Sequence, residues 1–363
     1  MEIPQTILHK RSPSVGNALN LEFDTVDPQY KKAGQDWYAI FNPQVQRVLD
    51  VDLVHSLDHE SIVCCVRFSY DGKYVATCCN HSAQIFDVQT GEKICVLYDS
   101  ETDMTTDLYF RSVCFSPDGR YLATGSKDKL IRIWDIQSRT IRSYFSGHEH
   151  WIVSLDFTRD GRTIASGSRD KTVRLWDVEQ GTNTFTLTIE DEVNSVAISP
   201  DTRFVAAGSL DSIVKIWDIH TGTLLERLEG PDGHKDGVFS IAFSPNGKNL
   251  ISGSLDQTFK MWELGAPYQG AKPGPRGGKC VKTFKDLRDF IVSVAFTPDA
   301  NWVLSGSKGG GVHFWDPRTG TTQLVLHGHE SIVISVAPSP KGGYFATGSA
   351  DKMARIWSYN QRS

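Results

Sequence analysis

The chain has 363 residues, of which 39% are hydrophobic and nine are tryptophan, enough to bury a large core in one compact domain. Its 38 lysines and arginines and 43 acidic residues give a net charge of -5, which argues against a surface that holds nucleic acid directly through its phosphates. No apolar run approaches the roughly 20 residues that span a bilayer, and the N-terminus lacks the apolar core of a signal peptide. We therefore expect an intracellular protein without membrane contact.

The first 46 residues do not repeat, are polar and contain four prolines, so they are predicted to form a partly flexible arm. Towards the end of this arm, the run DWYAIFNP is too apolar for a solvated tail and should pack against the folded part of the chain. The next stretch, VQRVLDVDLVHSL, is typical of a β-strand. These features divide the chain into an arm, residues 1–46, and one folded domain, residues 47–363.

From residue 86 onwards, an aromatic residue that is followed in most cases by an acidic one recurs seven times. The pairs are Phe86-Asp87, Trp134-Asp135, Trp176-Asp177, Trp217-Asp218, Trp262-Glu263, Trp315-Asp316 and Trp357-Ser358. Successive aromatic residues are 41 to 53 positions apart, the length of four short strands that form one propeller blade. The last copy stops after its third strand, so residues 47–57 should supply the fourth and close the ring.

The most regular copy, Gly147 to Asp177, reads GHEHWIVSLDFTRDGRTIASGSRDKTVRLWD and resembles the WD-repeat β-propellers, an all-β fold that here would have seven blades. In that family a histidine, a serine or threonine, an aspartate and a tryptophan hydrogen-bond in series and tie strands and loops together. The resemblance assigns this structural role to three sets of residues. They are His148, Ser166, Asp170 and Trp176; His234, Ser252, Asp256 and Trp262; and His329, Thr347, Asp351 and Trp357.

Serine, histidine and aspartate together also raise the possibility of a nucleophilic triad. The set occurs three times at the blade period, with histidine and aspartate always 22 residues apart, whereas a catalytic site is needed only once. The seven cysteines include two adjacent pairs, whose side chains would point to opposite faces of a strand, so they are predicted to be buried free thiols. We expect no enzymatic activity, no cofactor and no metal site.

Four of the seven copies depart from the pattern. The first has Asp58-His59 in place of Gly-His and Phe86 in place of tryptophan, and the second and fourth have no Gly-His pair. The sixth has Asp286-Leu287 at that position and also lacks the turn aspartate. The network of the first copy is predicted to be incomplete. The sixth copy lacks both the histidine and the turn aspartate. Losing the two together is expected, because a buried polar network with only some of its members satisfied is unfavourable.

Two insertions lengthen the repeat. Residues 99–107, DSETDMTTD, are acidic and rich in turn formers, and they are predicted to form a mobile surface loop. Residues 265–279, GAPYQGAKPGPRGGK, are rich in glycine and proline and are predicted to form a disordered connector.

A closer resemblance comes from the runs SLDHESIVCCVRFSYDGKYVATCCNHSAQIFDV, DLYFRSVCFSPDGRYLATGSKDKLIRIWDI and AAGSLDSIVKIWD. From about residue 36 to residue 357 the chain resembles the propeller of the fungal Tup-type general transcriptional corepressors, including its missing Gly-His pairs and double cysteines. The resemblance implies a nuclear docking module that DNA-binding repressor proteins recruit, and it leaves contact with histones or deacetylase complexes open. Family members also carry a helical segment for tetramerisation and for a tetratricopeptide-repeat corepressor partner. That segment does not occur in this sequence, so we expect a monomer.

Two kinds of loop lie at the entry to the inner strands and should form a ring around the mouth of the central channel. The residues just after the histidine position are Tyr109, Phe110, His150, Trp151, Phe290, Ser331 and Ile332. The residues just before the turn aspartates are Lys127, Arg169, Leu210, Leu255, Lys308 and Ala350. Exposed aromatic residues and arginines on loops are typical of protein-binding sites, so this ring is the predicted docking surface. The alternative is that some of these aromatic residues cap the inner strands and are half buried.

A different function is indicated by Trp315-Asp316-Pro317-Arg318, which fits the WD-x-R pattern of substrate receptors for cullin-type ubiquitin ligases. In those receptors the arginine reaches the ligase adaptor, so the motif predicts that Arg318→Ala abolishes adaptor binding. Because the repeat itself already supplies the tryptophan and the aspartate, the motif is short and we favour the corepressor interpretation.

Overall fold

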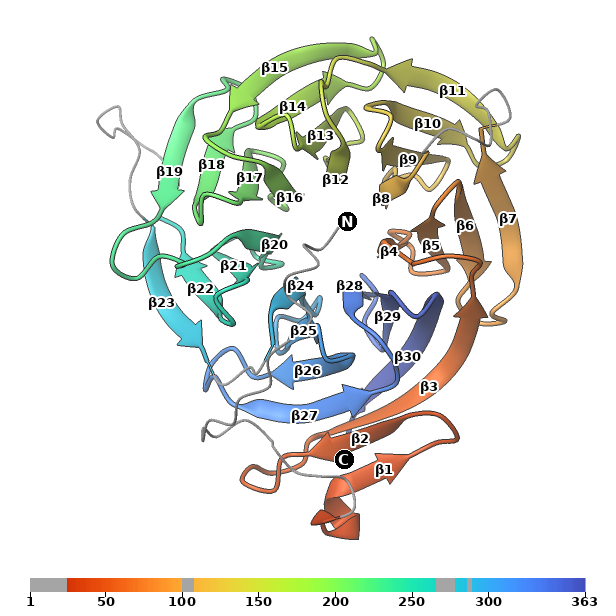
Figure 1. The fold of residues 1–363 in the computed structure, drawn as a ribbon, viewed down its shortest axis with the longest axis vertical. Coiled ribbons are helices and arrows are strands. Elements are labelled where there is room, and N and C mark those ends of the chain that lie inside the picture. The colour runs from red at the N-terminus through yellow and green to blue at the C-terminus, as the bar shows by residue number, and fades with distance from the viewer. Residues whose placement is uncertain (1–24, 100–107, 266–277, 286–288, 363) are drawn as a thin grey trace.

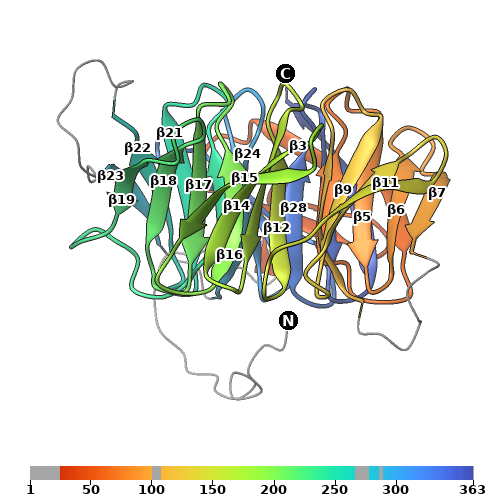
Figure 2. The same ribbon diagram turned by 90° about the horizontal axis from the view of Figure 1, so that it is seen from above.

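The computed structural model describes residues 25–99, 108–265, 278–285 and 289–362, and it has seven antiparallel sheets arranged around a central channel. Figure 1 looks down the channel, and Figure 2 shows the same disc from its edge. The predicted all-β, seven-bladed propeller is therefore confirmed. Of the two insertions, residues 100–107 and 266–277 lie outside the described part of the chain. Within the described part, no helix is long and apolar enough to cross a membrane.

Each blade has four strands that run from its inner to its outer edge, and in every blade except the seventh these four strands follow one another along the chain. Blades one and two contain β4 (Cys65–Phe68), β5 (Tyr74–Cys79), β6 (Ser82–Asp87), β7 (Lys93–Tyr98), β8 (Phe110–Phe115), β9 (Tyr121–Ser126), β10 (Ile131–Asp135) and β11 (Thr140–Phe145). Blades three and four contain β12 (Ile152–Phe157), β13 (Thr163–Ser168), β14 (Thr172–Asp177), β15 (Thr182–Thr188), β16 (Val193–Ile198), β17 (Phe204–Ser209), β18 (Val214–Asp218) and β19 (Leu224–Leu228).

Blades five and six contain β20 (Val238–Phe243), β21 (Asn249–Ser254), β22 (Phe259–Glu263), β23 (Lys279–Phe284), β24 (Ile291–Phe296), β25 (Val303–Ser307), β26 (Gly311–Trp315) and β27 (Thr322–His327). Blade seven contains β28 (Val333–Pro338), β29 (Tyr344–Ser349), β30 (Met353–Gln361) and β3 (Leu49–Asp58).

Blade seven is closed by a strand from the beginning of the chain. Strand β3 pairs antiparallel with β30, from Leu49 opposite Gln361 to Asp58 opposite Met353, with one bulge between Leu53 and His55. The sequence placed this closing strand at residues 47–57, which agrees with the structure to within two residues. The pairing joins the two ends of the propeller domain and covers a sheet edge that would otherwise lie open.

The segment before β3 forms a hairpin on the outside of blade six. A short 3-10 helix, η3 (Pro28–Tyr30), leads into β1 (Lys31–Ala33), and β2 (Tyr38–Phe41) returns and pairs with β27, so that this sheet has six strands. Figure 1 shows the hairpin on the rim of the disc. The run DWYAIFNP therefore packs by extending a sheet, with Ile40 and Phe41 buried. The boundary that we drew at residue 46 falls after this hairpin, and residues 1–24 lie outside the described part.

Side chains of the hairpin reach across to blade seven. The Trp37 ring meets the Trp357 ring edge-on, with 5.7 Å between the ring centroids. Lys32 donates to the carboxylates of Asp50 and Asp52 on β3, at 3.0 and 2.8 Å. The backbone of the hairpin pairs with blade six, and its side chains contact blade seven. The hairpin therefore links these two blades at the place where the ring closes.

The glycine in the repeated Gly-Ser of the second strand of blade three has a packing role. A Cβ atom at Gly167 would lie 2.6 Å from Val193 and 2.7 Å from Val196, both on the inner strand of blade four. Such distances are far inside van der Waals contact, so only glycine allows neighbouring blades to approach this closely. Interblade packing thus explains the glycine, which no rule about strand formation would predict.

The seven cysteines are all free thiols, and Cys280 alone among them is not buried. Within the described residues, no group of three or more histidine, cysteine or acidic side chains is placed to hold a metal ion.

Candidate docking site at the channel mouth

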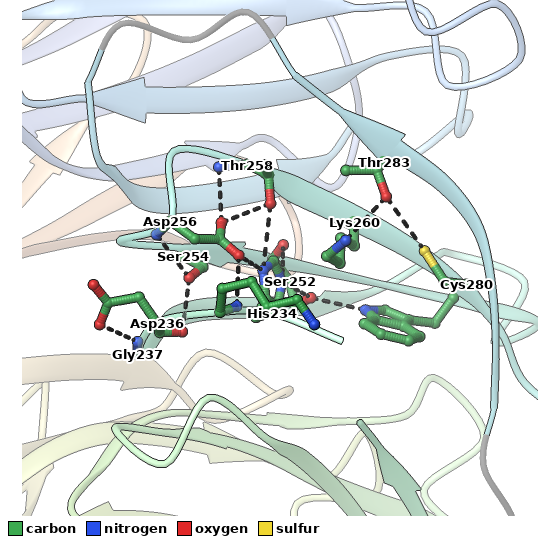
Figure 3. Close-up of polar contacts among 12 residues, drawn as sticks. His234, Asp236, Gly237, Ser252, Ser254, Asp256, Thr258, Lys260, Cys280 and Thr283 are labelled. Atoms are coloured by element: carbon green, nitrogen blue, oxygen red, sulfur yellow. Dashed lines mark hydrogen bonds and ion pairs between the residues drawn. The ribbon is translucent and has the colours of Figure 1, made fainter. Parts of the chain in front are cut away.

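In blades three, five and seven, the four polar residues of the repeat hydrogen-bond in series. In blade three, Trp176 Nε1 donates to Ser166 Oγ at 2.8 Å, His148 Nε2 lies 2.6 Å from the same oxygen, and His148 Nδ1 lies 2.7 Å from Asp170 Oδ2. Figure 3 shows the equivalent series in blade five, where His234 lies between Ser252 and Asp256. Blade seven repeats it, with His329 2.7 Å from Thr347 Oγ1 and 2.9 Å from Asp351 Oδ2.

The protonation of His148 follows from its partners. A carboxylate can only accept, so the Nδ1 hydrogen points at Asp170, and Nε2 accepts from the Ser166 hydroxyl. Burial lowers the pKa of His148 despite the nearby carboxylate, which favours this neutral form. Burial alone would raise the pKa of Asp170, but hydrogen bonds from His148 and Thr172 outweigh it and hold that pKa well below its usual range. The polar side-chain atoms of the series hydrogen-bond to one another, which is typical of a network that stabilises the blade.

We expect Asp170→Ala to lower the free energy of unfolding by about 1 to 3 kcal/mol, because it leaves the buried His148 Nδ1 and the Glu149 backbone N–H without their acceptor. Since the native pKa of Asp170 is depressed, its contribution is present above the ordinary aspartate pKa and is lost as the pH falls below it. Urea denaturation at neutral and acidic pH measures both effects, with the exposed Glu149→Ala as control. An Asp170→Ala variant that keeps its stability but loses partner binding would contradict a purely structural role.

Blades two and four replace the histidine by a buried cation from their third strand. In blade two, Arg132 donates to Asp99 at 2.9 Å and to the turn residue Asp128 at 2.6 Å. In blade four, Lys215 forms ion pairs with Glu190 and, at 3.8 Å, with the turn residue Asp211. The carboxylates Asp99 and Glu190 come from the loop that supplies the histidine in other blades. Asp99 is therefore buried in an ion pair, whereas the sequence placed it in a mobile loop.

Blades one and six have shorter networks. His59 lies 2.8 Å from Thr77 Oγ1 and 2.9 Å from the Leu57 carbonyl oxygen, and the described contacts of its ring include no carboxylate, so the predicted incompleteness of blade one is confirmed. In blade six, Trp315 Nε1 donates to Ser305 Oγ at 3.0 Å. Asp286 and Leu287, which stand at the Gly-His position there, lie outside the described residues.

Backbone hydrogen bonds place the two kinds of ring loop at the same end of the propeller. The N–H of Lys127 donates to the carbonyl of Tyr109 at 2.9 Å, and the N–H of Arg169 donates to the carbonyl of Trp151 at 3.0 Å. The same bond joins Leu210 to Glu192, Leu255 to Gly237 and Ala350 to Ile332. Both loops therefore lie at one mouth of the channel, whose volume is 660 Å³ and whose wall is formed by the inner strands.

Four of the predicted ring residues meet in one cluster on blades two and three. Lys127 Nζ lies 4.5 Å from the centre of the Trp151 ring and 5.9 Å from that of Tyr109. The Arg169 guanidinium lies 4.6 Å from the centre of the Trp151 ring, and it also contacts Glu192 at 3.3 Å. These are cation–π distances, and they fix the aromatic rings in a half-exposed position.

The other ring residues do not join this cluster. Lys308 lies 5.5 Å from the Phe290 ring and forms a second aromatic–cation pair, on blade six. His150 is exposed and its ring tilts against that of Trp151, with 5.4 Å between the ring centroids. The remaining members of the ring are partly exposed and lie on blades four, five and seven. They are Leu210, Leu255, Ser331, Ile332 and Ala350.

The prediction that Phe110 belongs to the exposed docking ring is wrong. Its side chain is fully buried and meets the Trp134 ring edge-on, with 6.2 Å between the ring centroids. Phe110 is the first residue of β8, so it points between blades while its neighbours Tyr109 and Arg111 point elsewhere. It packs the core of blade two and is not available to a partner.

Arg111 belongs to the cluster, and we did not predict it from the sequence. Its guanidinium lies 5.7 Å from the Trp151 ring and 6.0 Å from the Tyr109 ring, and it lines the channel. The residue lies inside an inner strand, outside the two loop positions on which the prediction was based. The strand alternation does contain the signal, since Phe110 and Ser112 are buried and the partly exposed Arg111 lies between them; Ser112 Oγ accepts from the Leu155 N–H of blade three.

Comparisons with known proteins agree with this architecture. Seven segments match the family described as WD domain, G-beta repeat, at residues 51–87, 105–135, 139–177, 181–218, 223–263, 278–316 and 320–358. The chain is 68% identical over 353 residues to the transcriptional repressor rco-1 of Neurospora crassa, which covers 95% of this chain and 58% of that protein. It is 45% identical over 407 residues to the general transcriptional corepressor TUP1 of Saccharomyces cerevisiae, covering 94% of this chain and 57% of that protein.

A third relative, the general transcriptional corepressor tupA of Dictyostelium discoideum, is 54% identical over 338 residues, which cover 91% of this chain and 56% of the relative. The chain thus spans little more than half the length of the relatives it matches.

Proposed function

The chain belongs to the WD domain, G-beta repeat family, and from this premise we propose that it is the docking propeller of a Tup-type transcriptional corepressor. Its role is to bind DNA-binding repressor proteins at the channel mouth, in the nucleus and without catalysis. The observation that carries this proposal is the cluster of Tyr109, Lys127, Trp151 and Arg169 on two neighbouring blades. The names of the relatives support a role in transcriptional repression.

The chemistry of the cluster suits a short peptide segment of a repressor. Half-exposed tyrosine and tryptophan rings offer apolar area with little side-chain entropy to lose, and arginine and lysine beside them can pair with an acidic side chain. Direct binding of nucleic acid is not part of the proposal. A tetratricopeptide-repeat partner, histones and deacetylase complexes are further partners that the resemblance suggests.

We expect Trp151→Ala to weaken the binding of a repressor by about 2 kcal/mol, or roughly thirtyfold, because it removes a central aromatic contact. Lys127→Ala should cost less and should mainly change the salt dependence of binding, because it removes a charge at the edge of the site. Repression by a reporter-tethered repressor measures the effect, with protein level and melting temperature recorded for each variant. If Trp151→Ala lowers the melting temperature by several degrees while repression per molecule is unchanged, Trp151 is a packing residue and the docking surface lies elsewhere.

The ubiquitin-ligase alternative is not supported. Arg318 would have to reach an adaptor, but its guanidinium folds back on its own Asp316, with two hydrogen bonds of 3.1 Å. The three relatives described above are named as transcriptional repressors or corepressors.

A further inference from the structure

Blade one differs from the other six blades at one position where its inner and second strands face each other. In the register of these strands, Cys65 on β4 lies directly opposite Cys78 on β5. The same position in every other blade pairs a serine with a glycine. These pairs are Ser112 with Gly125, Ser154 with Gly167, Ser195 with Gly208, Ser240 with Gly253, Ser293 with Gly306 and Ser335 with Gly348. Blade one therefore departs from the repeat at both members of the pair, and both residues are cysteine.

The packing between blades explains the serine and the glycine but not the two cysteines. A Cβ atom at Gly167 would lie 2.6 Å from a side chain of blade four, so this position favours glycine. Ser154 Oγ accepts from the Val196 N–H of blade four at 3.0 Å. In blade one, Cys65 Sγ instead lies 3.8 Å from the Val113 carbonyl oxygen of blade two. The second thiol, on β5, has no counterpart in this packing scheme.

The backbone places these two thiols where a disulfide can form. Residues directly opposite each other in an antiparallel pair point to the same face of the sheet, and their Cα atoms are about 4.5 to 5.5 Å apart. Disulfides join residues whose Cα atoms are roughly 4.4 to 6.8 Å apart. Cys65 and Cys78 also belong to one buried cluster at the contact between blades one and two. Joining the two sulfur atoms therefore needs no rearrangement of the strands.

The two thiols differ in access and in acidity. Cys65 lines the central channel, whose volume is 660 Å³, whereas Cys78 is fully buried behind it. The neighbouring Cys78 thiol lowers the pKa of Cys65 to about 6 and outweighs the opposite effect of burial, while burial raises the pKa of Cys78 well above its usual range. Because the thiolate is the nucleophile, Cys65 is the thiol that reacts first with a small oxidant in the channel.

We propose that Cys65 and Cys78 form an oxidation site, at which hydrogen peroxide generates a reversible disulfide within blade one. The Cys65 sulfur attacks one oxygen of the peroxide, so that an S–O bond forms, the O–O bond breaks, and the leaving oxygen departs as water with the thiol proton. The Cys78 sulfur then attacks the Cys65 sulfur, so that the S–S bond forms, the S–O bond breaks, and hydroxide departs as water with the Cys78 proton. The two sulfurs lose two electrons and the peroxide gains them.

This inference goes beyond the docking function and does not depend on it. The disulfide joins the inner strand to the second strand of blade one, the blade in which the described contacts of the His59 ring include no carboxylate. Disulfides that form in reducing compartments are usually transient and redox-sensing, and a thiol reductant reverses them.

The first test treats the folded full chain with hydrogen peroxide, unfolds it in an alkylating reagent and maps its tryptic peptides by mass. We expect two fewer alkylated thiols and a disulfide between the peptides 48–67 and 74–93, which carry Cys64 with Cys65 and Cys78 with Cys79. The mass of the unalkylated chain should fall by about 2 Da, the mass of two hydrogen atoms, and dithiothreitol should restore it.

Substitutions identify which of these cysteines are linked. Cys65→Ser and Cys78→Gly each introduce the residue that the other six blades have at that position, and each should abolish the linked peptide. Cys64→Ser and Cys79→Ser are the matched controls and should keep it. The melting temperature verifies that each variant folds, and Cys78→Ser replaces Cys78→Gly if that variant does not.

The second test measures the order of attack with dimedone, which traps sulfenic acids. In Cys78→Gly, peroxide should leave Cys65 as a sulfenic acid that dimedone labels, because the second thiol is missing. In Cys65→Ser, labelling of Cys78 should be roughly tenfold lower, because that thiol is buried and protonated. Equal labelling in the two variants would overturn the assigned order.

Several results of the first test would overturn the site itself. They are a linked peptide that survives Cys65→Ser or Cys78→Gly, a link to Cys114 in the peptide 112–120, and a pair that oxidises only after the chain is unfolded. The absence of any link at a peroxide concentration that oxidises the partly exposed Cys280 would do the same. Docking at the channel mouth is tested separately by Trp151→Ala.

Discussion

Deleting residues 1–58 is expected to leave a chain that does not fold into a soluble propeller. The deletion removes β3, whose pairing with β30 runs from Leu49 opposite Gln361 to Asp58 opposite Met353 and closes the ring. It also uncovers buried residues of that blade, among them Trp357 and Ile356, and leaves β30 as an open edge for aggregation. Circular dichroism and the soluble fraction after expression measure the result.

The matched control is a deletion of residues 1–44, which removes the β1–β2 hairpin but keeps β3. This shorter deletion should yield soluble protein with a lower melting temperature, since blade six keeps its four inner strands and only the outer clamp is lost. A soluble, cooperatively melting product from the 1–58 deletion would show that β3 is dispensable for closure.

Trp37→Ala is expected to cost about 3 to 5 kcal/mol of unfolding free energy, the usual range for a buried tryptophan. Trp37 is only 9% exposed, belongs to the same core cluster as Phe345 and Trp357, and meets the Trp357 ring edge-on. Its removal leaves a cavity between the hairpin and blade seven, at the place where the ring closes. Urea denaturation measures the change.

Tyr98→Ala is the control for this substitution, because that aromatic residue is 63% exposed on the outer strand of blade one. It should change the stability by less than about 0.5 kcal/mol. If Trp37→Ala also costs less than about 1 kcal/mol of unfolding free energy, the hairpin does not contribute to the stability of the closed ring.

The buried centres of the blades show how one architectural task is met by different chemistry. Blades three, five and seven use a neutral histidine between a hydroxyl and a carboxylate, whereas blades two and four use Arg132 or Lys215 between two carboxylates. Each arrangement links the loop before the inner strand to the turn between the second and third strands. A repeat that lacks the histidine can therefore still have a polar link between this loop and this turn.

The sequence by itself determined the number of blades, because the period of 41 to 53 residues leaves room for four short strands in each copy. It also determined the closing strand, because the last copy ends one strand short and the stretch directly before the first copy has the pattern of a strand. The three histidine networks follow from local spacing, since His148 and Asp170 flank one hairpin whose register the repeat fixes. All of these features depend on residues that are close in sequence or related by the repeat.

Only the tertiary structure decided the features that depend on contacts between distant segments. The hairpin pairs β2 with β27 across almost the whole chain, and no local pattern specifies which blade an extra strand will join. Phe110 and Arg111 are adjacent in β8, yet one is buried against Trp134 and the other lines the channel; which side each takes depends on how neighbouring blades pack. The convergence of Lys127, Arg169 and Arg111 on Trp151 has the same origin, because two blades must be placed side by side before these side chains can meet.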